Sequence, residues 1–357
     1  MPPILRFILR RSLFIPLSFF VITATLFGIL MLAPPEARAE LYVPPRLPPN
    51  FTEEDFQRLI QIIIRDHGLD DPMPVQYVRW LSGLLQGEWA YSPALDGEIL
   101  PSLLARVPTT SELAIYTSLF FIPLGLVSGV LAARSRGRLI DSAFRLSAFI
   151  GTSIPPFILG LWLLSLFYVA LRWFPPERLS QASGLFVSSS GEFTSFTGLL
   201  TIDGLLNGSP DISLDALRHL ALPVLTLSLS HWATLGRLTR SSVLEEMERA
   251  YVLAARARGV SRSGVVWRHA FRNALVPSLN STALSAASLV TGIYVVEVVF
   301  NFNGIAELVI RSVSASPDIG LATGFAVFSV LLVLPIMLAL DVIQAVVDPR
   351  IREGVAS

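Results

Sequence analysis

Six long apolar stretches divide the chain, and each predicts a transmembrane helix. They reach or approach the roughly 20 residues that an α-helix needs to cross the hydrocarbon core of a bilayer. The fourth is the least regular, because His231, Trp232 and several hydroxyl side chains interrupt it. The pattern predicts an all-α membrane protein with spans at Leu13–Leu32, Ser111–Ala133, Leu146–Leu171, His219–Gly236, Ala274–Phe300 and Ile319–Val347.

The composition supports lipid as the solvent of most of the chain. Of the 357 residues, 52% are hydrophobic and 15% are charged, whereas an average soluble domain has about 25% charged residues. The 27 acidic and 27 basic residues cancel, so the net charge gives no indication of a nucleic-acid partner. The absence of cysteine excludes disulfides, thiolate metal sites and cysteine nucleophiles.

The positions of the arginines predict the orientation of the spans. Arginines are dense before the first span, in the short connection 134–145, between Arg237 and Arg272, and after the last span. The positive-inside rule places these segments, and therefore both termini, in the cytoplasm. The first apolar run also precedes a cleavage-like Ala37-Arg38-Ala39 sequence, but its length favours a membrane span over a signal peptide.

The two long external connections differ in their predicted structure. In residues 33–110 a proline-rich linker is followed by Thr52 and three acidic residues, a capping-box-like helix start. Gly68 is a suitable end for that helix, and Pro74 a suitable first turn for a second one. This segment could be a folded cap or a surface for a partner. Residues 172–218 are rich in serine and glycine and predict a loop.

The connection between the fourth and fifth spans predicts a helix, a glycine turn and a second helix. Acidic residues near the start of the first helix and arginines near its end complement the helix dipole. Gly259 can adopt the left-handed conformation that ends a helix, and Ser261 or Ser263 can cap the next helix, from Gly264 to Ala274. The first helix is expected to present one apolar stripe made of Leu244, Met247, Tyr251, Ala254 and Ala255.

This basic connection has two interpretations. Anionic lipid headgroups attract arginine-rich segments, but that attraction requires only charge and no capped helices. A helix pair that meets at a glycine favours protein docking, because the small Ala254 and Ala255 side chains would allow another protein to approach closely.

At these residues the chain resembles a known family. Ala254-Ala255-x-x-x-Gly259 followed by Pro277 is similar to the cytoplasmic docking loop of permease subunits of ATP-binding-cassette (ABC) importers, in the dipeptide, oligopeptide and nickel branch. Further matches to this branch are Arg240-Ser241-Ser242, Tyr251-Val252, Arg272-Asn273-Ala274, Glu297-x-x-Phe300-x-x-x-Gly304 and Asp348-Pro349-Arg350-Ile351-Arg352. The chain departs from the family pattern at Ala250, Leu253 and Ala254.

The resemblance implies half of a substrate path in a bacterial plasma (inner) membrane. Its implied partners are a second homologous permease, usually in a heterodimer, two ABC ATPase subunits and an extracytoplasmic binding protein. The implied ATPase-docking residues are Glu246, Tyr251, Ala254, Ala255, Arg256, Arg258, Gly259, Arg262, Arg272 and Pro277. Peptides are the default substrate, and nickel or another small solute stays open.

The chain is not expected to be an enzyme or to bind a cofactor. It has no G-x-x-x-x-G-K-[ST] phosphate loop, so ATP and Mg belong to the ATPase subunits. The four histidines are scattered, which argues against a metal site. An ion-gradient-driven secondary transporter is the main alternative, although the paired midplane acids typical of that class are not evident. An intramembrane enzyme would need a catalytic pair at membrane depth, and no such pair is evident in the sequence.

Residues within the spans give weaker hypotheses about gating or the substrate path. Ionisable side chains inside a membrane are often functional. Glu297 and Asp341, however, lie near span ends where water could solvate them. The candidates are Glu297, Asp341, His231, Pro155 and Pro156, the two prolines because they should break the third span.

Four segments follow from this pattern. They are residues 1–32 (N-terminus and first span), 33–110 (external linker and helices), 111–347 (a five-span core with the docking loop 237–277) and 348–357 (a cytoplasmic tail).

Overall fold

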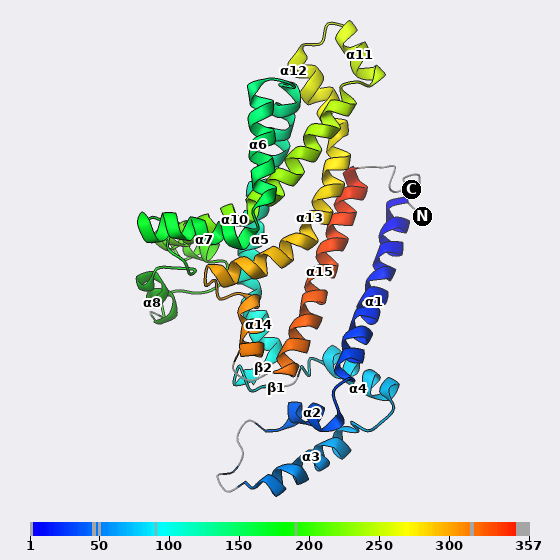
Figure 1. Cartoon of the computed structure of the whole chain (residues 1–357), viewed down its shortest axis with the longest axis vertical. Coiled ribbons are helices and arrows are strands. Elements are labelled where there is room, and N and C mark those ends of the chain that lie inside the picture. Colours follow the sequence, from blue (N-terminus) through cyan, green and yellow to red (C-terminus); the bar gives the residue numbers. More distant parts are fainter. Residues whose placement is uncertain are drawn as a thin grey trace. The chain divides into compact units, whose positions relative to one another are not determined.

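The computed structural model consists mainly of α-helices and describes residues 3–44, 48, 51–89, 91–189, 191–314 and 318–347 (Figure 1). It divides into two compact units, which are described separately. Unit 1 consists mainly of Pro108–Gly304, and unit 2 mainly of Ile8–Val107 and Ile305–Ile336.

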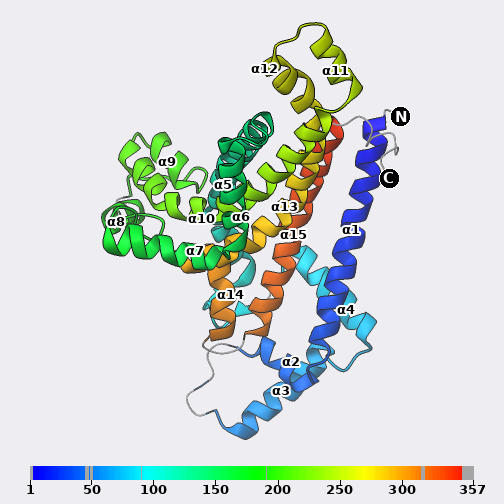
Figure 2. The same ribbon diagram turned by 45° about the horizontal axis from the view of Figure 1, so that its top comes forward.

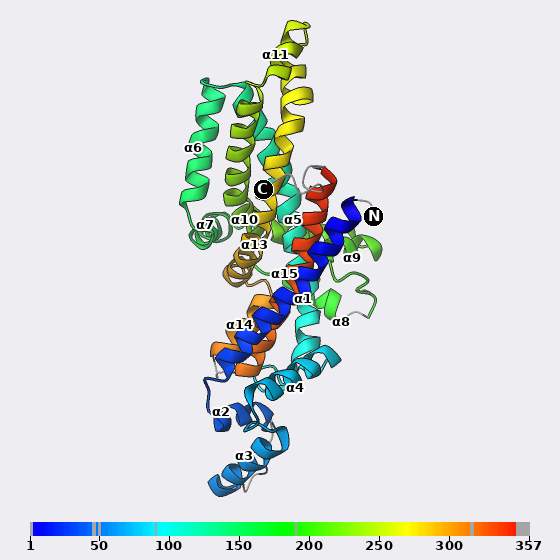
Figure 3. The ribbon, with the colours of Figure 1, turned by 90° about the vertical axis from the view of Figure 1, so that its right-hand side faces the viewer.

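Unit 1 is a helical bundle arranged around α10. Its elements are most of α5 (Ile99–Arg134), then α6 (Leu139–Ser153), α7 (Pro156–Leu163), the π-helix η2 (Leu164–Ala170), α8 (Gln181–Ser189), α9 (Leu200–Leu206), α10 (Pro210–Glu246), α11 (Ala250–Ala257), α12 (Arg262–Gly264), the π-helix η3 (Val265–Ala270) and α13 (Phe271–Val299). Helix α10 packs along both α6 and α13, and Figure 3 shows these three helices side by side.

Glycines allow α5 and α10 to approach closely. Gly125 and Gly129 are four residues apart on α5 and therefore share one helix face. A Cβ atom on Gly129 would lie 2.5 Å from the carbonyl oxygen of Gly236 on α10. This is the close backbone contact that small residues at fourfold spacing allow between membrane helices, where dispersion contacts replace the hydrophobic effect.

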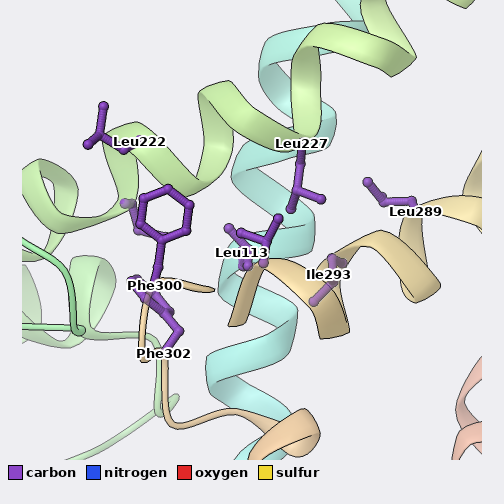
Figure 4. Close-up of a cluster of buried hydrophobic side chains, with 9 residues drawn as sticks. Leu113, Leu222, Leu227, Leu289, Ile293, Phe300 and Phe302 are labelled. Atoms are coloured by element: carbon purple, nitrogen blue, oxygen red, sulfur yellow. The ribbon is translucent and has the colours of Figure 1, made fainter. Parts of the chain in front are cut away.

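A second part of unit 1 has a core of large apolar side chains. Leu113 of α5 and Leu227 of α10 meet Ile293 of α13, and Phe300 and Phe302 close the cluster (Figure 4). All five side chains are buried. Because these residues come from three helices and the turn after α13, their packing fixes the end of α13 against α5 and α10.

The Pro155-Pro156 pair interrupts the third apolar stretch, as predicted. Ile154 adopts an extended conformation, as expected for a residue before proline, and ends α6. Helix α7 then begins with Pro156 in its first turn, and the axis bends by 100° (Figure 2). The structure therefore contains a broken apolar pair, Leu139–Ser153 and Pro156–Ala170.

The prediction that residues 172–218 form a loop was wrong. They contain α8, α9 and the first turns of α10, which begins at Pro210 instead of near His219. The buried carboxylate of Glu112 on α5 accepts hydrogen bonds from the Thr201 backbone and hydroxyl (2.9 and 2.7 Å) and from Arg178 (2.7 Å). Serine and glycine suggested an unstructured connection, but buried polar contacts of this kind order it.

Another buried carboxylate organises the turn before α9. Asp203 accepts hydrogen bonds from the backbone and hydroxyl of Thr197 and from the Gly198 backbone. Burial raises the pKa of Asp203, but these hydrogen bonds and one from Ser195 outweigh it and leave the pKa below its ordinary value.

Unit 2 combines apolar helices with a small helical segment. Its elements are most of α1 (Pro3–Leu30), α2 (Pro35–Ala39), the 3₁₀ turn η1 (Glu40–Tyr42), α3 (Glu53–His67), α4 (Met73–Gln86), the strands β1 (Tyr91–Ser92) and β2 (Gly97–Glu98), α14 (Ile305–Ser314) and the first part of α15 (Ile319–Val347). The strands pair antiparallel, with Tyr91 opposite Glu98. Helix α4 contacts α1 through a 2.8 Å hydrogen bond between Tyr77 and Thr23 and through the rings of Trp80 and Phe27.

The predicted helices of unit 2 are confirmed. Thr52 and Asp55 form a reciprocal capping box at the start of α3, and Gly68 ends it in the left-handed conformation, with φ 58°. An apolar face of α3 packs around Ile60, Ile63 and Ile64. Helix α4 begins with Pro74 in its first turn, as predicted.

Within the described residues, three helices are long and apolar enough to cross a membrane: Ser12–Leu30, Ile99–Arg134 and Pro210–Glu246. The broken pair would make a fourth span, and Ser288–Val299 and Ile319–Pro335 are shorter apolar helices. The fold is thus an all-α membrane protein, and the count of six spans stays a prediction.

Candidate functional site

The predicted helix–glycine–helix connection is a helical hairpin at one end of unit 1. Helices α11 and α12 lie beyond the ends of α10 and α13, and the arrangement is visible in each view (Figures 1 and 3). We call residues 250–264, which comprise α11, the glycine turn and α12, the hairpin.

The expectation of one continuous helix from Leu244 to Ala255 is wrong. Helix α10 ends at Glu246, and Arg249 takes an extended conformation before α11 begins at Ala250. Arg249 forms an ion pair with Glu245 (2.9 Å), and the Tyr251 hydroxyl donates a hydrogen bond to Glu246. The glutamates that were expected to complement the dipole at the start of one helix therefore join two helices across a turn.

The glycine turn confirms the prediction for Gly259. Its φ is 79°, the Gly259 amide donates to the carbonyl of Arg256 (2.9 Å), and the Val260 amide donates to that of Ala255 (3.2 Å). This pair of hydrogen bonds is a Schellman motif. Of the two predicted caps for α12, Ser261 is the one used, since its Oγ accepts a hydrogen bond from Gly264 (3.2 Å). The second helix then continues through η3 into α13, and Pro277 lies inside α13.

The hairpin shares its core with three long helices. Ala255 is fully buried, so the expectation that it offers a surface to another protein was wrong. It packs with Val252, also of α11, because these two residues are three positions apart on one helix face. The shared core consists of Val130, Ala133, Val243, Val252, Ala255, Val265, Val266, Ala270 and Ala274, from α5, α10, α11, η3 and α13.

Polar contacts add to this anchoring. Arg262 donates to the carbonyl oxygen of Arg134 (3.1 Å), the last residue of α5, where helix carbonyls lack partners within the helix. Burial and the hydrogen bond to Glu246 raise the pKa of the Tyr251 phenol. The hydroxyl therefore remains a donor at neutral pH.

Sequence reasoning missed a buried ion pair below the hairpin. Arg240 on α10 binds both carboxylate oxygens of Asp141 on α6, at 2.6 and 2.9 Å, and the Asp141 side chain is 2% exposed. The Gly137 amide also donates to Asp141 (3.0 Å). Arg240 had been noted only as part of a matching tripeptide. The sequence signal for this pair was Asp141 itself, an isolated acidic residue just before a long apolar stretch.

The exposed residues of the hairpin form its outer face. Leu253 is 53% exposed, and Ala254, Arg256 and Arg258 are also exposed. Tyr251 is partly exposed, so the expected apolar stripe divides into a buried side and an outer side. Arg272 and Pro277 are exposed on α13.

The candidates for the substrate path have different surroundings. Glu297 is 2% exposed rather than solvated; its carboxylate accepts a hydrogen bond from Thr110, and Gly304 packs directly against it. His231 is buried against the ring of Phe121, with a centroid distance of 5.4 Å. Pro155 and Pro156 lie at the α6–α7 bend. The side chain of Asp341 lies outside the described residues.

No group of three or more histidine or acidic side chains suited to a metal ion occurs among the residues that the structure describes. The described residues thus form a membrane component in which a bundle of apolar helices supports a polar-tipped hairpin on shared packing.

Comparison with known families identifies this component. The family model described as binding-protein-dependent transport system inner membrane component matches residues 123–353, and the corresponding N-terminal model matches residues 4–114. The chain belongs to this family and is a permease subunit of an ABC importer.

Its relatives are similar over nearly the whole chain. The di/tripeptide transport system permease protein DppB of Pseudomonas aeruginosa (strain UCBPP-PA14) is 34% identical over 349 residues, which cover 98% of this chain and 99% of the relative. The probable D,D-dipeptide transport system permease protein DdpB of Escherichia coli (strain K12) is 33% identical, over 83% of this chain and 85% of the relative. The oligopeptide transport system permease protein AppB of Bacillus subtilis (strain 168) is 30% identical, over 97% of this chain and 99% of the relative.

Proposed function

We propose that this chain forms half of the path of a peptide importer and that its hairpin receives the force of a separate ATPase. The relatives named above are transport permeases for di- and tripeptides, D,D-dipeptides and oligopeptides, which supports peptides as the substrate class. The second half would come from a homologous permease, two ATPase subunits would bind on the cytoplasmic side, and an extracytoplasmic protein would deliver substrate.

The observation that carries the proposal is the shared core of the hairpin. A loop tethered only at its two ends could move without moving the spans. Here Ala255 and Val252 belong to one buried apolar cluster with Val130 of α5 and Ala274 of α13. Because packed apolar cores resist deformation, displacement of α11 would displace the ends of these helices as one body.

The outer face has the chemistry for a protein partner. Leu253 and Ala254 provide apolar contact, and Arg256 and Arg258 provide charges for acidic groups on the ATPase. Glu246 and Arg262 act from within, since they hold Tyr251 and the end of α5. We retain six spans, cytoplasmic termini, the external segment 33–110, the core 111–347 and the tail 348–357 as parts of this proposal.

Purification and reconstitution test the proposal. Extraction of the chain with its membrane neighbours should recover a second permease and two ATPase subunits per complex. Vesicles containing that complex and the binding protein should take up a radiolabelled dipeptide only with ATP on the ATPase side. Uptake by the chain alone under an ion gradient would overturn the proposal and support a secondary transporter.

A further inference from the structure

Unit 2 contains a cavity of about 530 Å³ to which the function proposed above gives no role. Aromatic side chains line much of it, including Phe27, Tyr42, Trp80 and Trp89. Such rings, apolar over most of their surface and polar at one edge in Tyr and Trp, are enriched at the boundary between membrane and water. The cavity thus has walls suited to an apolar ligand.

Arg38 lines this cavity and is 6% exposed. Its guanidinium donates to Gln76 Oε1 (2.6 Å), to the Leu69 carbonyl (3.0 Å) and to the Ala33 carbonyl (3.2 Å). These acceptors orient the group but leave its positive charge in place. No carboxylate forms an ion pair with Arg38 in the part of the chain that the structure describes. A buried cation without a counter-ion is costly, so the site favours an anion.

The other charged groups of the lining do not neutralise Arg38. The charge of Arg79 is already compensated by Asp71, at 2.7 Å. Glu88 is exposed to solvent, where its charge is screened. The guanidinium of Arg38 is therefore the buried charge that a ligand in this cavity would meet.

The rest of the lining belongs to apolar helices. Phe27 and Leu30 are at the end of the candidate span Ser12–Leu30, and Gly320 and Gly324 are in the first turns of the apolar helix Ile319–Pro335. Gly324 lets α15 pack closely against Ile99, since a Cβ atom at this position would lie 2.7 Å from Ile99 Cγ2. A ligand here would contact a buried cation at one point and membrane-type helices at another, which requires an anionic head attached to a hydrocarbon chain.

We propose that this cavity binds one membrane phospholipid, with its phosphodiester at Arg38 and an acyl chain along α1 and α15. The aromatic side chains enclose the glycerol region between them. A peptide fits less well, because its polar backbone would lose water against apolar walls without new hydrogen-bond partners. The lipid would thereby connect α1, α4 and α15 within unit 2.

Native mass spectrometry of the purified transporter complex tests this binding. The complex is stripped of lipid in detergent and titrated with phosphatidylglycerol. Arg38→Met removes the charge and keeps an apolar side chain, and it should weaken binding of one lipid about tenfold, since a hydrogen bond to a charged group contributes on that order. Arg65→Met is the matched control: Arg65 is an exposed residue of α3 outside the cavity lining, and its variant should bind like the wild type.

Thr323→Phe is a second variant that tests the site without changing Arg38, so that a folding defect of Arg38→Met cannot be mistaken for loss of the site. It fills the cavity from α15 and leaves Arg38 and its acceptors unchanged. It should also remove the bound lipid. Equal lipid binding by the wild type, Arg38→Met and Thr323→Phe would overturn the proposal. Displacement of the lipid by a tripeptide would assign the cavity to peptide, and equally tight retention of inorganic phosphate alone would show a site for the free anion; either result also overturns the proposal.

Discussion

Two helical segments outside the apolar helices, the hairpin in unit 1 and α2–α3 in unit 2, are built alike and anchored differently. Each has a helix that ends at a glycine with positive φ, Gly259 or Gly68, and a small apolar core. The core at α3 comes from α2, α3 and the turn after it. The core of the hairpin also takes residues from α5, α10 and α13. The α2–α3 segment can therefore be stable by its own packing, whereas the hairpin depends on the long helices that it would move.

The largest loss of stability is expected at the buried ion pair between Arg240 of α10 and Asp141 of α6. Arg240→Ala leaves the buried Asp141 carboxylate without its partner and should cost about 3–5 kcal/mol of stability. Thermal unfolding of the detergent-solubilised complex, followed by size-exclusion chromatography, measures the loss. Arg136→Ala is the control, since its pair with Glu248 is exposed and should contribute little. Equal losses in the two variants would contradict the role of the buried pair.

The next effect separates the two sides of α11. Ala255→Leu overfills the shared core and should cost about 1–3 kcal/mol. Ala254→Leu adds the same atoms on the exposed side and should change stability little. Hydrogen exchange of the α11 amides reports the local opening free energy of each variant. Equal protection in both variants would show that α11 does not use Ala255 as an anchor.

Glycine substitutions compare the two turns directly. Gly259→Ala should cost about 1–2 kcal/mol, the strain of a left-handed alanine, because no atom lies within 4 Å of the added Cβ. Gly68→Ala should cost slightly more, since its Cβ would also displace the ends of the exposed Asp71 and Arg79 side chains, which are able to move. Amide exchange in α11 and α3 measures both losses. A greater loss at Gly259 would reverse this ranking.

The smallest effect is a pH dependence limited to α3. Hydrogen bonds from Thr52 lower the pKa of Asp55, so its stabilising effect is present above the unfolded pKa and is lost as the pH falls through the folded pKa. Exchange protection of α3 should begin to decline near the ordinary aspartate pKa of about 4 and continue to fall below it. Asp55→Asn should show a weaker decline over the same interval, and an identical decline would exclude this carboxylate as the cause.

Local signals in the sequence were sufficient to predict where several helices are capped and where one is broken. Thr52, Gly68, Gly259 and the Pro155-Pro156 pair act on the backbone beside them, so their effects follow from their own positions. Burial depends on distant partners, and sequence periodicity cannot identify these. Ala255 was therefore expected on the wrong surface, and Glu297 was expected at a span end open to water, although it is buried beside Thr110 and Gly304.

The helix break after α10 was missed for the same reason, because it depends on contacts between side chains across the turn. The glutamates at its end suited a helix start by charge alone, but Glu245 and Glu246 bind Arg249 and Tyr251 across the turn. The order in residues 172–218 comes from the carboxylates of Glu112 and Asp203, one of which lies in a preceding helix. Serine and glycine content carries no information about such contacts.

The most direct test of the account compares one exposed leucine of the hairpin with one of α4 in unit 2. Leu253 of α11 is 53% exposed and Leu85 of α4 is 73% exposed, so aspartate at either position should leave the fold intact. Leu253→Asp should abolish copurification of the ATPase subunits and reduce ATP-driven dipeptide uptake at least tenfold, whereas Leu85→Asp should retain both. ATPase recovery and uptake that are unchanged in Leu253→Asp would contradict the assignment of the hairpin as the docking element.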